Sequence, residues 1–137
     1  MIGISVKAKY GLAAMFELAR FVKTGPIQSR QISHVHQIPQ NYLEQVLTDL
    51  KKAGFIQSFR GVNGGYALSK RPEHIMIIDV LEALEGPISL STGHKGCNRL
   101  SSFWSTINDQ VKNSFNLTLS EVLHRQQREE KMLTYSI

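Results

Sequence analysis

The most informative segment of this chain runs from Pro39 to Ser69 and reads PQNYLEQVLTDLKKAGFIQSFRGVNGGYALS. Its first half repeats apolar residues at the spacing of a helix, and its second half has the pattern of two short strands. Asn-Gly-Gly at 63–65 supplies the positive φ angles that a tight hairpin turn needs. We therefore predict an amphipathic helix at about 39–53, followed at once by a two-stranded wing at about 55–69.

The predicted helix has two different faces. Four apolar residues at helical spacing should point to the core, namely Leu43, Val46, Leu47 and Leu50. The opposite face carries the amides of Gln40, Asn41 and Gln45, and Arg60 lies just before the hairpin tip. Gln and Asn can form a two-pronged pair with adenine in the major groove, and arginine is attracted to a narrow minor groove. This pattern is typical of a DNA-reading helix and wing.

Helical patterns also lie on both sides of this segment. Ser5 can cap a first helix that ends near Thr24, and Ser29 can cap a short second helix. A tight turn would join that second helix to the one at 39–53, which gives a helix-turn-helix. A further short helix is expected at 76–85, where the residues are largely apolar.

We expect a mainly α fold with three parts. Residues 1–86 form a winged helix-turn-helix domain, 87–97 form a loop, and 98–137 form a long dimerisation helix and a C-terminal tail. Thr118 and Glu121 have the spacing of a capping box that starts a last helix. The final residues, MLTYSI, alternate in polarity and predict a strand or a docked tail.

The net charge of +5 is unevenly distributed along the 137 residues. Residues through Arg71 hold ten Lys and Arg against three Asp and Glu, whereas the remainder holds six against eight. The basic excess therefore lies in the half that contains the predicted helix and wing. Such a distribution is expected of a protein that binds a polyanion.

Composition and motifs argue against several other classes of protein. No run of about 18 apolar residues is available to span a membrane. A single cysteine cannot form a disulfide within the chain, which favours a reducing, cytoplasmic compartment. No Ser-His-Asp set or paired carboxylate has motif support, and the glycine-rich turn lacks the lysine and hydroxyl of a P-loop. We therefore expect a cytoplasmic protein that is not an enzyme.

Several short motifs stand in the order and spacing of a known family. They are Lys7 with Tyr10-Gly11-Leu12, Tyr42-Leu43-Glu44-Gln45, Ser58-Phe59-Arg60-Gly61, Gly64-Gly65-Tyr66 and Leu84-Glu85-Gly86-Pro87. Over roughly residues 2–125 the chain resembles the bacterial Rrf2 family of transcription regulators, which includes IscR-like and CymR-like proteins. The resemblance implies a homodimeric winged-helix protein that binds imperfect palindromes in double-stranded DNA, most often as a repressor.

The resemblance also implies roles for individual residues. The implied DNA-contacting residues are Lys7, Tyr10, Ser29, Gln40, Asn41, Tyr42, Gln45, Arg60, Asn63 and Gly64. Gln40, Asn41, Tyr42 and Gln45 would lie in the major groove and Arg60 in the minor groove, while the first three residues of the set would contact phosphates. From the residues alone, Tyr42 could equally be a core aromatic, and Glu44 is expected to be a local ion-pair partner.

A stripe of large apolar residues near the end of the chain predicts a dimer interface. The stripe consists of Leu100, Phe103, Trp104, Ile107, Val111 and Phe115. One small core does not readily hide this much apolar surface, whereas a second copy of the chain can cover it. The alternative is that the stripe folds back on its own domain. The resemblance to the cysteine-metabolism branch of the family implies that a regulatory protein could be a further partner.

The only cysteine, Cys97, makes an iron–sulphur cluster doubtful. A cluster generally takes about four protein ligands, mostly thiolates, so one monomer does not supply them. The chain is therefore closer to the family branch that lacks the cluster cysteines. Cys97 could be an inert thiol, a redox sensor, or, with His94 and the same pair of a second copy, a zinc ligand. His34 and His36 flank the helix-turn-helix turn, where surface or phosphate-side roles are expected.

The rival to a DNA-binding regulator is a protein-interaction module. In that alternative a winged-helix fold would use its basic face to bind an acidic partner protein. Affinity for duplex DNA that falls with salt and discriminates between sequences distinguishes the regulator from the module.

Overall fold

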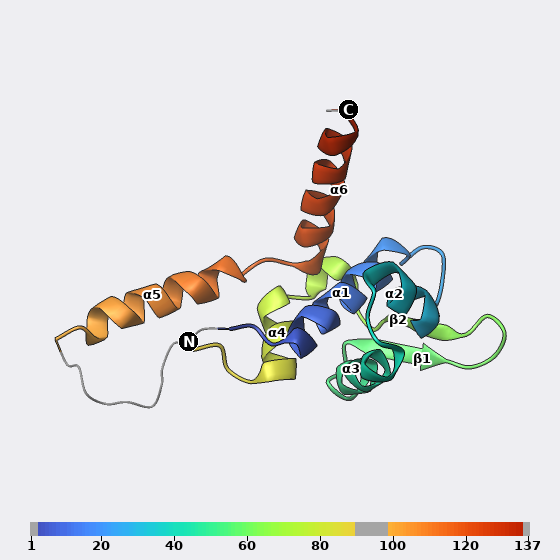
Figure 1. The fold of residues 1–137 in the computed structure, drawn as a ribbon, viewed down its shortest axis with the longest axis horizontal. Helices are drawn as coiled ribbons and strands as arrows, with labels where there is room; N and C mark the ends of the chain where they lie inside the picture. The colour runs from blue at the N-terminus through green and yellow to red at the C-terminus, as the bar shows by residue number, and fades with distance from the viewer. Residues whose placement is uncertain (1–2, 90–98, 136–137) are drawn as a thin grey trace.

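The computed structural model describes residues 3–89 and 99–135. This part of the chain is mainly helical, with one small two-stranded sheet (Figure 1). In chain order the elements are α1 (Val6–Arg20), α2 (Ser29–His36), α3 (Gln40–Lys52), β1 (Ile56–Phe59), β2 (Gly65–Leu68), the 3-10 helix η1 (Pro72–His74), α4 (Ile77–Glu85), α5 (Ser101–Ser114) and α6 (Leu119–Tyr135). The predicted mainly α fold with a wing is confirmed.

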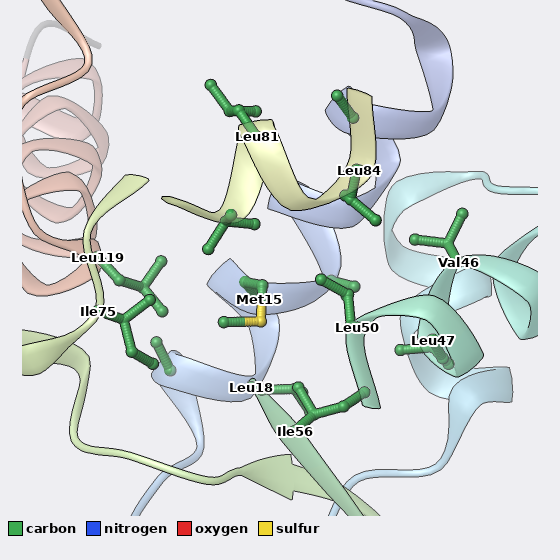
Figure 2. Packing of buried hydrophobic residues seen from close by; sticks show 14 of the residues in the cluster. Met15, Leu18, Val46, Leu47, Leu50, Ile56, Ile75, Leu81, Leu84 and Leu119 are labelled. Atoms are coloured by element: carbon green, nitrogen blue, oxygen red, sulfur yellow. The ribbon is translucent and has the colours of Figure 1, made fainter. Parts of the chain in front are cut away.

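The core is built around α1, which packs against α3, α4, α6 and the strand β2. Figure 2 shows residues of several elements meeting there, among them Met15 of α1, Leu50 of α3, Leu81 of α4 and Leu119 of α6. All four apolar residues that we predicted to face inward on α3 are buried. Burial of these side chains holds the polar face of α3 toward solvent.

The sequence predicts the start of helix α1 correctly, but not its end. Its N-terminus is capped as predicted, because Ser5 Oγ accepts a hydrogen bond from the Ala8 N–H at 3.1 Å. Its C-terminus lies at Arg20, earlier than the expected end near Thr24. There the Thr24 N–H bonds the Phe21 carbonyl at 3.0 Å, three residues back, so the chain turns instead of continuing the helix.

The helix-turn-helix consists of α2, a tight turn, and α3. Gln37 adopts a left-handed backbone conformation with φ of 53°, and Ile38 is buried directly after it. The hydroxyl of Ser33 donates to the Ile38 carbonyl at 2.6 Å. Ser29 was expected to cap α2, but it is the first residue of the helix, and Gln28 is the cap position. The Ser29 hydroxyl instead donates a hydrogen bond to Glu44 on α3.

The wing is an antiparallel hairpin in which Phe59 pairs with Gly65 at the tip end. Its second strand also pairs with the segment before α2, where Ile27 and Tyr66 exchange two backbone hydrogen bonds of 2.9 and 2.8 Å. Gly65 has φ of 140°, and a Cβ there would lie 2.5 Å from the Ile27 carbonyl. Only glycine allows the strand to approach Ile27 so closely.

The C-terminal part contains the predicted long helix and last helix, which are α5 and α6. The capping box that begins α6 is confirmed: the Thr118 N–H donates to Glu121 Oε2 at 2.9 Å, and the Glu121 N–H donates to Thr118 Oγ1 at 3.1 Å. The predicted strand or docked tail is wrong for the described residues. Met132 to Tyr135 continue α6, and Met132, Leu133 and Tyr135 are exposed. None of the described helices has the length and apolar character that a membrane crossing requires.

Candidate nucleic-acid interface

The outer face of α3 carries the predicted row of amides. Gln40, Asn41 and Gln45 are all exposed, on the side opposite the buried leucines. Tyr42 is 37% exposed, so it is not a core aromatic. Its ring packs edge-on against Tyr10 of α1, with ring centroids 5.5 Å apart. Both tyrosines belong to the predicted DNA-contacting set, and Tyr10 holds the ring of Tyr42 in place.

A second contact joins α1 to α3 close to this pair. Lys7 Nζ lies 2.6 Å from Asp49 Oδ2, and both side chains are more than one third exposed. An exposed ion pair of this kind contributes only about 0–1 kcal/mol, since water screens it. An ammonium group has three N–H donors, so Lys7 keeps donors for a further acceptor. Lys7 thus lies beside α3, with a positive charge at the surface.

Glu44 is a hydrogen-bond acceptor for three elements rather than an ion-pair partner. Its Oε1 accepts from Ser29 Oγ at 2.6 Å and from Gln40 Nε2 at 2.8 Å, and its Oε2 accepts from the Tyr66 hydroxyl at 3.4 Å. Within residues 3–89 and 99–135, no cation lies within ion-pair distance of it. The expected ion pair is therefore wrong, and Glu44 instead connects α2, α3 and β2.

Tyr66 is a site residue that the sequence analysis did not single out. Burial raises the pKa of its hydroxyl above the usual value, and the nearby Glu44 carboxylate raises it further. The hydroxyl therefore stays protonated and can donate to that carboxylate. The Gly64-Gly65-Tyr66 motif was the available signal, since it contributes to the turn and to the family resemblance, but neither assigns a role to the tyrosine hydroxyl.

The wing lies beside α3, separated from it by a polar cleft of about 360 Å³. The cleft is lined by Gln28, Ser29, Arg30, Gln40, Glu44, Gly61, Gly64, Gly65 and Tyr66. Lys51 of α3 donates to Ser58 Oγ of β1 at 2.6 Å, which ties the wing to the end of α3. At the tip, Arg60, Val62 and Asn63 are exposed, whereas Gly64 is buried in the turn.

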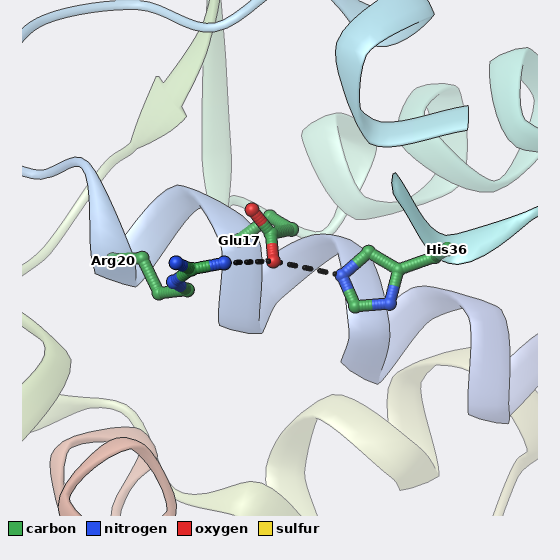
Figure 3. A network of polar contacts seen from close by, with 3 residues as sticks. All are labelled: Glu17, Arg20 and His36. Atoms are coloured by element: carbon green, nitrogen blue, oxygen red, sulfur yellow. Dashed lines mark hydrogen bonds and ion pairs between the residues drawn. The ribbon is translucent and has the colours of Figure 1, made fainter. Parts of the chain in front are cut away.

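Between α1 and α2, the structure places a carboxylate that the sequence did not indicate. Glu17 of α1 is only 2% exposed. Its Oε1 accepts from Arg20 Nη1 at 3.0 Å and lies 2.9 Å from Nε2 of His36, the last residue of α2 (Figure 3). His36 had been expected to have a surface or phosphate-side role. The structure corrects this: its ring nitrogen faces the buried carboxylate.

The apolar stripe along α5 is exposed at its start and packed at its end, with the half-buried Ile107 between these two parts. Val111 and Phe115 pack against the core, as in the alternative in which the stripe folds back. Leu100, Phe103 and Trp104 are each 51% exposed, and the rings of Phe103 and Trp104 meet edge-on. Figure 1 shows α5 extending away from the body, on the side opposite the wing. The first half of α5 therefore presents a free apolar face.

Cys97 and His94 lie outside the described residues. Within residues 3–89 and 99–135, no group of three or more His, Cys, Asp and Glu side chains could hold a metal ion. The sequence contains one cysteine, whereas an iron–sulphur cluster generally takes four protein ligands that are mostly thiolates. The donor set of a single chain does not fit such a cluster.

Known proteins are similar to this chain in sequence and in fold. Residues 4–125 match the Rrf2 family, which is described as iron-dependent transcriptional regulators. The chain is 37% identical over 123 residues to the HTH-type transcriptional regulator CymR of Bacillus subtilis (strain 168), with 88% of each chain covered. It is 30% identical over 132 residues to the HTH-type transcriptional regulator IscR of Enterobacter sp. (strain 638), covering 90% of this chain and 81% of IscR.

Solved structures agree with these sequence similarities. The structure of CymR (YrzC), the global cysteine regulator of B. subtilis, superposes with a TM-score of 0.85 at 35% identity, covering 91% of this chain and 98% of that one. The structure of T. potens IscR gives a TM-score of 0.76 at 29% identity, covering 91% of this chain and 88% of that one.

Proposed function

Because the chain belongs to the Rrf2 family of transcriptional regulators, we propose that it binds a specific sequence in double-stranded DNA and represses transcription there. The observation that carries this proposal is the exposed row of Gln40, Asn41 and Gln45 on α3, with Arg60 on the adjacent wing. Amide side chains on a helix suit the major groove, and an arginine on a projecting turn suits the minor groove.

The elements divide the work of binding. Helix α3 enters the major groove, where its amides and Tyr42 contact base edges, and the wing places Arg60 and Asn63 at the minor groove. Lys7 and Tyr10 of α1 lie beside α3 and contact phosphates. Ser29 donates its hydroxyl hydrogen to Glu44, so this hydroxyl is not the phosphate donor. The backbone N–H of Ser29, at the start of α2, makes the phosphate contact instead. Gly64 shapes the turn that presents the tip.

The protein acts as a homodimer whose two copies contact each other through α5. The support for this is the apolar face of Leu100, Phe103 and Trp104, which is half exposed in one chain. A second copy of the same face would cover it, as in two-fold symmetric dimers generally. Two copies of α3 related by such an axis read two half-sites, so the operator is a palindrome. As a regulator of bacterial genes, the protein works in the cytoplasm.

The proposed regulator works without an iron–sulphur cluster, although the family description names iron. One cysteine per chain is the support for this difference. Purification without oxygen, followed by metal analysis and an absorption spectrum, tests it. Stoichiometric iron and sulphide with a visible charge-transfer band would contradict the proposal.

The binding proposal is tested by titrating labelled duplexes at several salt concentrations. A pool of random duplexes first yields an enriched sequence, and a scrambled version of it is the control. We expect affinity that falls steeply with salt and a preference for the enriched sequence of about 10³-fold or more. Absence of any duplex binding at low salt would instead support a protein-interaction module.

A further inference from the structure

The amide of Gln40, the first residue of α3, is held by two neighbours. Its Nε2 lies 2.8 Å from Ser29 Oγ and 2.8 Å from Glu44 Oε1. Ser29 Oγ in turn lies 2.6 Å from the same oxygen of Glu44. The three side chains form a closed ring of hydrogen bonds between the starts of α2 and α3.

The chemistry of the ring fixes which way the amide points. A carboxylate has no hydrogen to donate, so Ser29 must donate its hydroxyl hydrogen to Glu44, and Gln40 must face Glu44 with its NH₂ group. The lone pair of Ser29 Oγ then accepts from the same NH₂ group. The flipped amide would place its carbonyl oxygen against the carboxylate, with two acceptors in contact. The NH₂ group therefore points into the protein, and the carbonyl oxygen points away from the ring.

The carbonyl oxygen of Gln40 is the polar group that remains for DNA. Gln40 is exposed, and no hydrogen bond within residues 3–89 and 99–135 uses this oxygen. Asn41 and Gln45 differ, because neither side-chain amide is hydrogen-bonded within the same part of the chain. These two amides keep both a donor and an acceptor for a base.

We propose that Gln40 reads its base pair through the carbonyl oxygen alone and selects a base with an exocyclic amino group in the major groove. An acceptor pairs with adenine N6 or cytosine N4 and is repelled by thymine O4 or guanine O6. This differs from the two-pronged pairing with adenine that the sequence suggested, since that pairing also needs an amide N–H at adenine N7. The inference rests on the proposed function, in which α3 lies in the major groove.

Ser29 and Glu44 are then positioning residues that set the specificity of Gln40. The Tyr66 hydroxyl, which donates to the other oxygen of Glu44 at 3.4 Å, holds the carboxylate from the wing side. Removing the Ser29 hydroxyl frees an N–H of Gln40, so Ser29→Ala should let Gln40 make the two-pronged contact. The expected result is a gain of adenine over cytosine at one operator position, rather than a general loss of affinity.

Selection from random duplexes by four proteins tests this. Gln40→Ala identifies the operator position that Gln40 reads, since its base preference disappears there. The wild-type chain should enrich both adenine and cytosine at that position over guanine and thymine. Ser29→Ala should favour adenine over cytosine by about tenfold, the size expected of one extra base contact. Ser33→Ala, another serine of α2 whose hydroxyl bonds Ile38, is the matched control and should match the wild type.

Base analogues test the same point with the wild-type protein, at the operator position that Gln40→Ala identifies. At the identified position, replacing adenine with purine, which lacks the N6 amino group, should weaken binding about tenfold. Replacing it with 7-deazaadenine, which lacks the N7 acceptor, should leave the affinity unchanged. An equal loss with both analogues would show two-pronged pairing and overturn the inference.

The remaining outcomes separate this inference from the proposed function. If the wild-type protein enriches no sequence, the proposed DNA binding itself fails. If it enriches a sequence but Gln40→Ala alters no position, only the inference fails. A shift toward adenine in Ser33→Ala as large as that in Ser29→Ala would also overturn it, because Ser33 does not contact Gln40.

Discussion

Glu17 of α1 and His36, the last residue of α2, join the two helices, with Glu17 Oε1 2.9 Å from His36 Nε2. A carboxylate can only accept, so the imidazole donates from Nε2. The same oxygen accepts from Arg20, and the carboxylate is almost fully buried. This contact anchors the end of α2 to α1 directly before the turn that leads into α3.

Glu17→Gln should therefore destabilise the fold by about 1–3 kcal/mol, because it weakens two hydrogen bonds to a buried charge. The measurement is urea unfolding at a fixed protein concentration. Glu73→Gln, on the exposed face of η1, is the matched control and should change the free energy of unfolding by less than about 0.5 kcal/mol. Equal stability of the two variants would show that the Glu17 contacts contribute nothing.

Gly65→Ala should destabilise the wing by about 1–3 kcal/mol, because alanine is strained at a φ of 140° and its Cβ would meet the Ile27 carbonyl. Faster proteolysis between β1 and β2 and a lower melting temperature are the expected signs. Gly3→Ala is the control, since a Cβ at Gly3 meets nothing within 4 Å. An unchanged cleavage rate for Gly65→Ala would contradict the tight pairing of the wing with Ile27.

Arg60→Ala should cost about 1–3 kcal/mol of binding to the enriched operator, with the loss concentrated on sites that have the preferred minor-groove sequence. Arg128→Ala, an exposed arginine on α6, removes the same charge away from the wing. Fluorescence anisotropy with the operator and its scrambled version measures both variants. Unchanged operator affinity in Arg60→Ala would show that Arg60 of the wing does not contact the operator.

Lys7→Ala should weaken binding to all sequences alike and reduce the slope of log K against log salt by about 1, since one phosphate contact is lost. Lys131→Ala, on the distal part of α6, is the control for net charge. Titrations of operator and scrambled duplex over a series of salt concentrations give both slopes. A sequence-dependent loss in Lys7→Ala would point instead to its ion pair with Asp49 on α3.

Trp104→Glu should convert the proposed dimer to a monomer, because it places a charge in the apolar face of α5. Sedimentation at micromolar concentration measures the change, and operator binding should weaken with it. Leu133→Glu is the control, as Leu133 is exposed on α6, outside that face. A wild-type chain that sediments as a monomer would rule out dimerisation through α5.

Local patterns were enough to predict α3 and the wing. The spacing of Leu43, Val46, Leu47 and Leu50 defines one buried helix face, and Asn-Gly-Gly defines the turn, so neither depends on distant parts of the chain. The capping box at Thr118 is equally local. These features depend on residues within a few positions of each other, which the sequence displays directly.

Contacts between distant residues could not be predicted in this way. Glu17 and His36 are 19 positions apart, and Glu44 and Tyr66 are 22 positions apart, so tertiary packing alone brings them together. The prediction of a strand or tail at the end of α6 was wrong for a different reason. Gln, Arg, Glu and Lys in QQREEK favour helix strongly, and the helix continues through the alternating residues that had suggested a strand.

The backbone pairing of Ile27 with Tyr66, together with the contact between Lys51 and Ser58, holds the wing at the Ser58–Tyr66 pair, one position from the tip end of the hairpin. The separation between α3 and the wing is therefore set before any duplex arrives. In the proposed complex the duplex then has to match the spacing between α3 and the wing, so the energy of adjustment falls on the DNA. Base pairs that no side chain contacts would then influence affinity through how easily they bend or narrow.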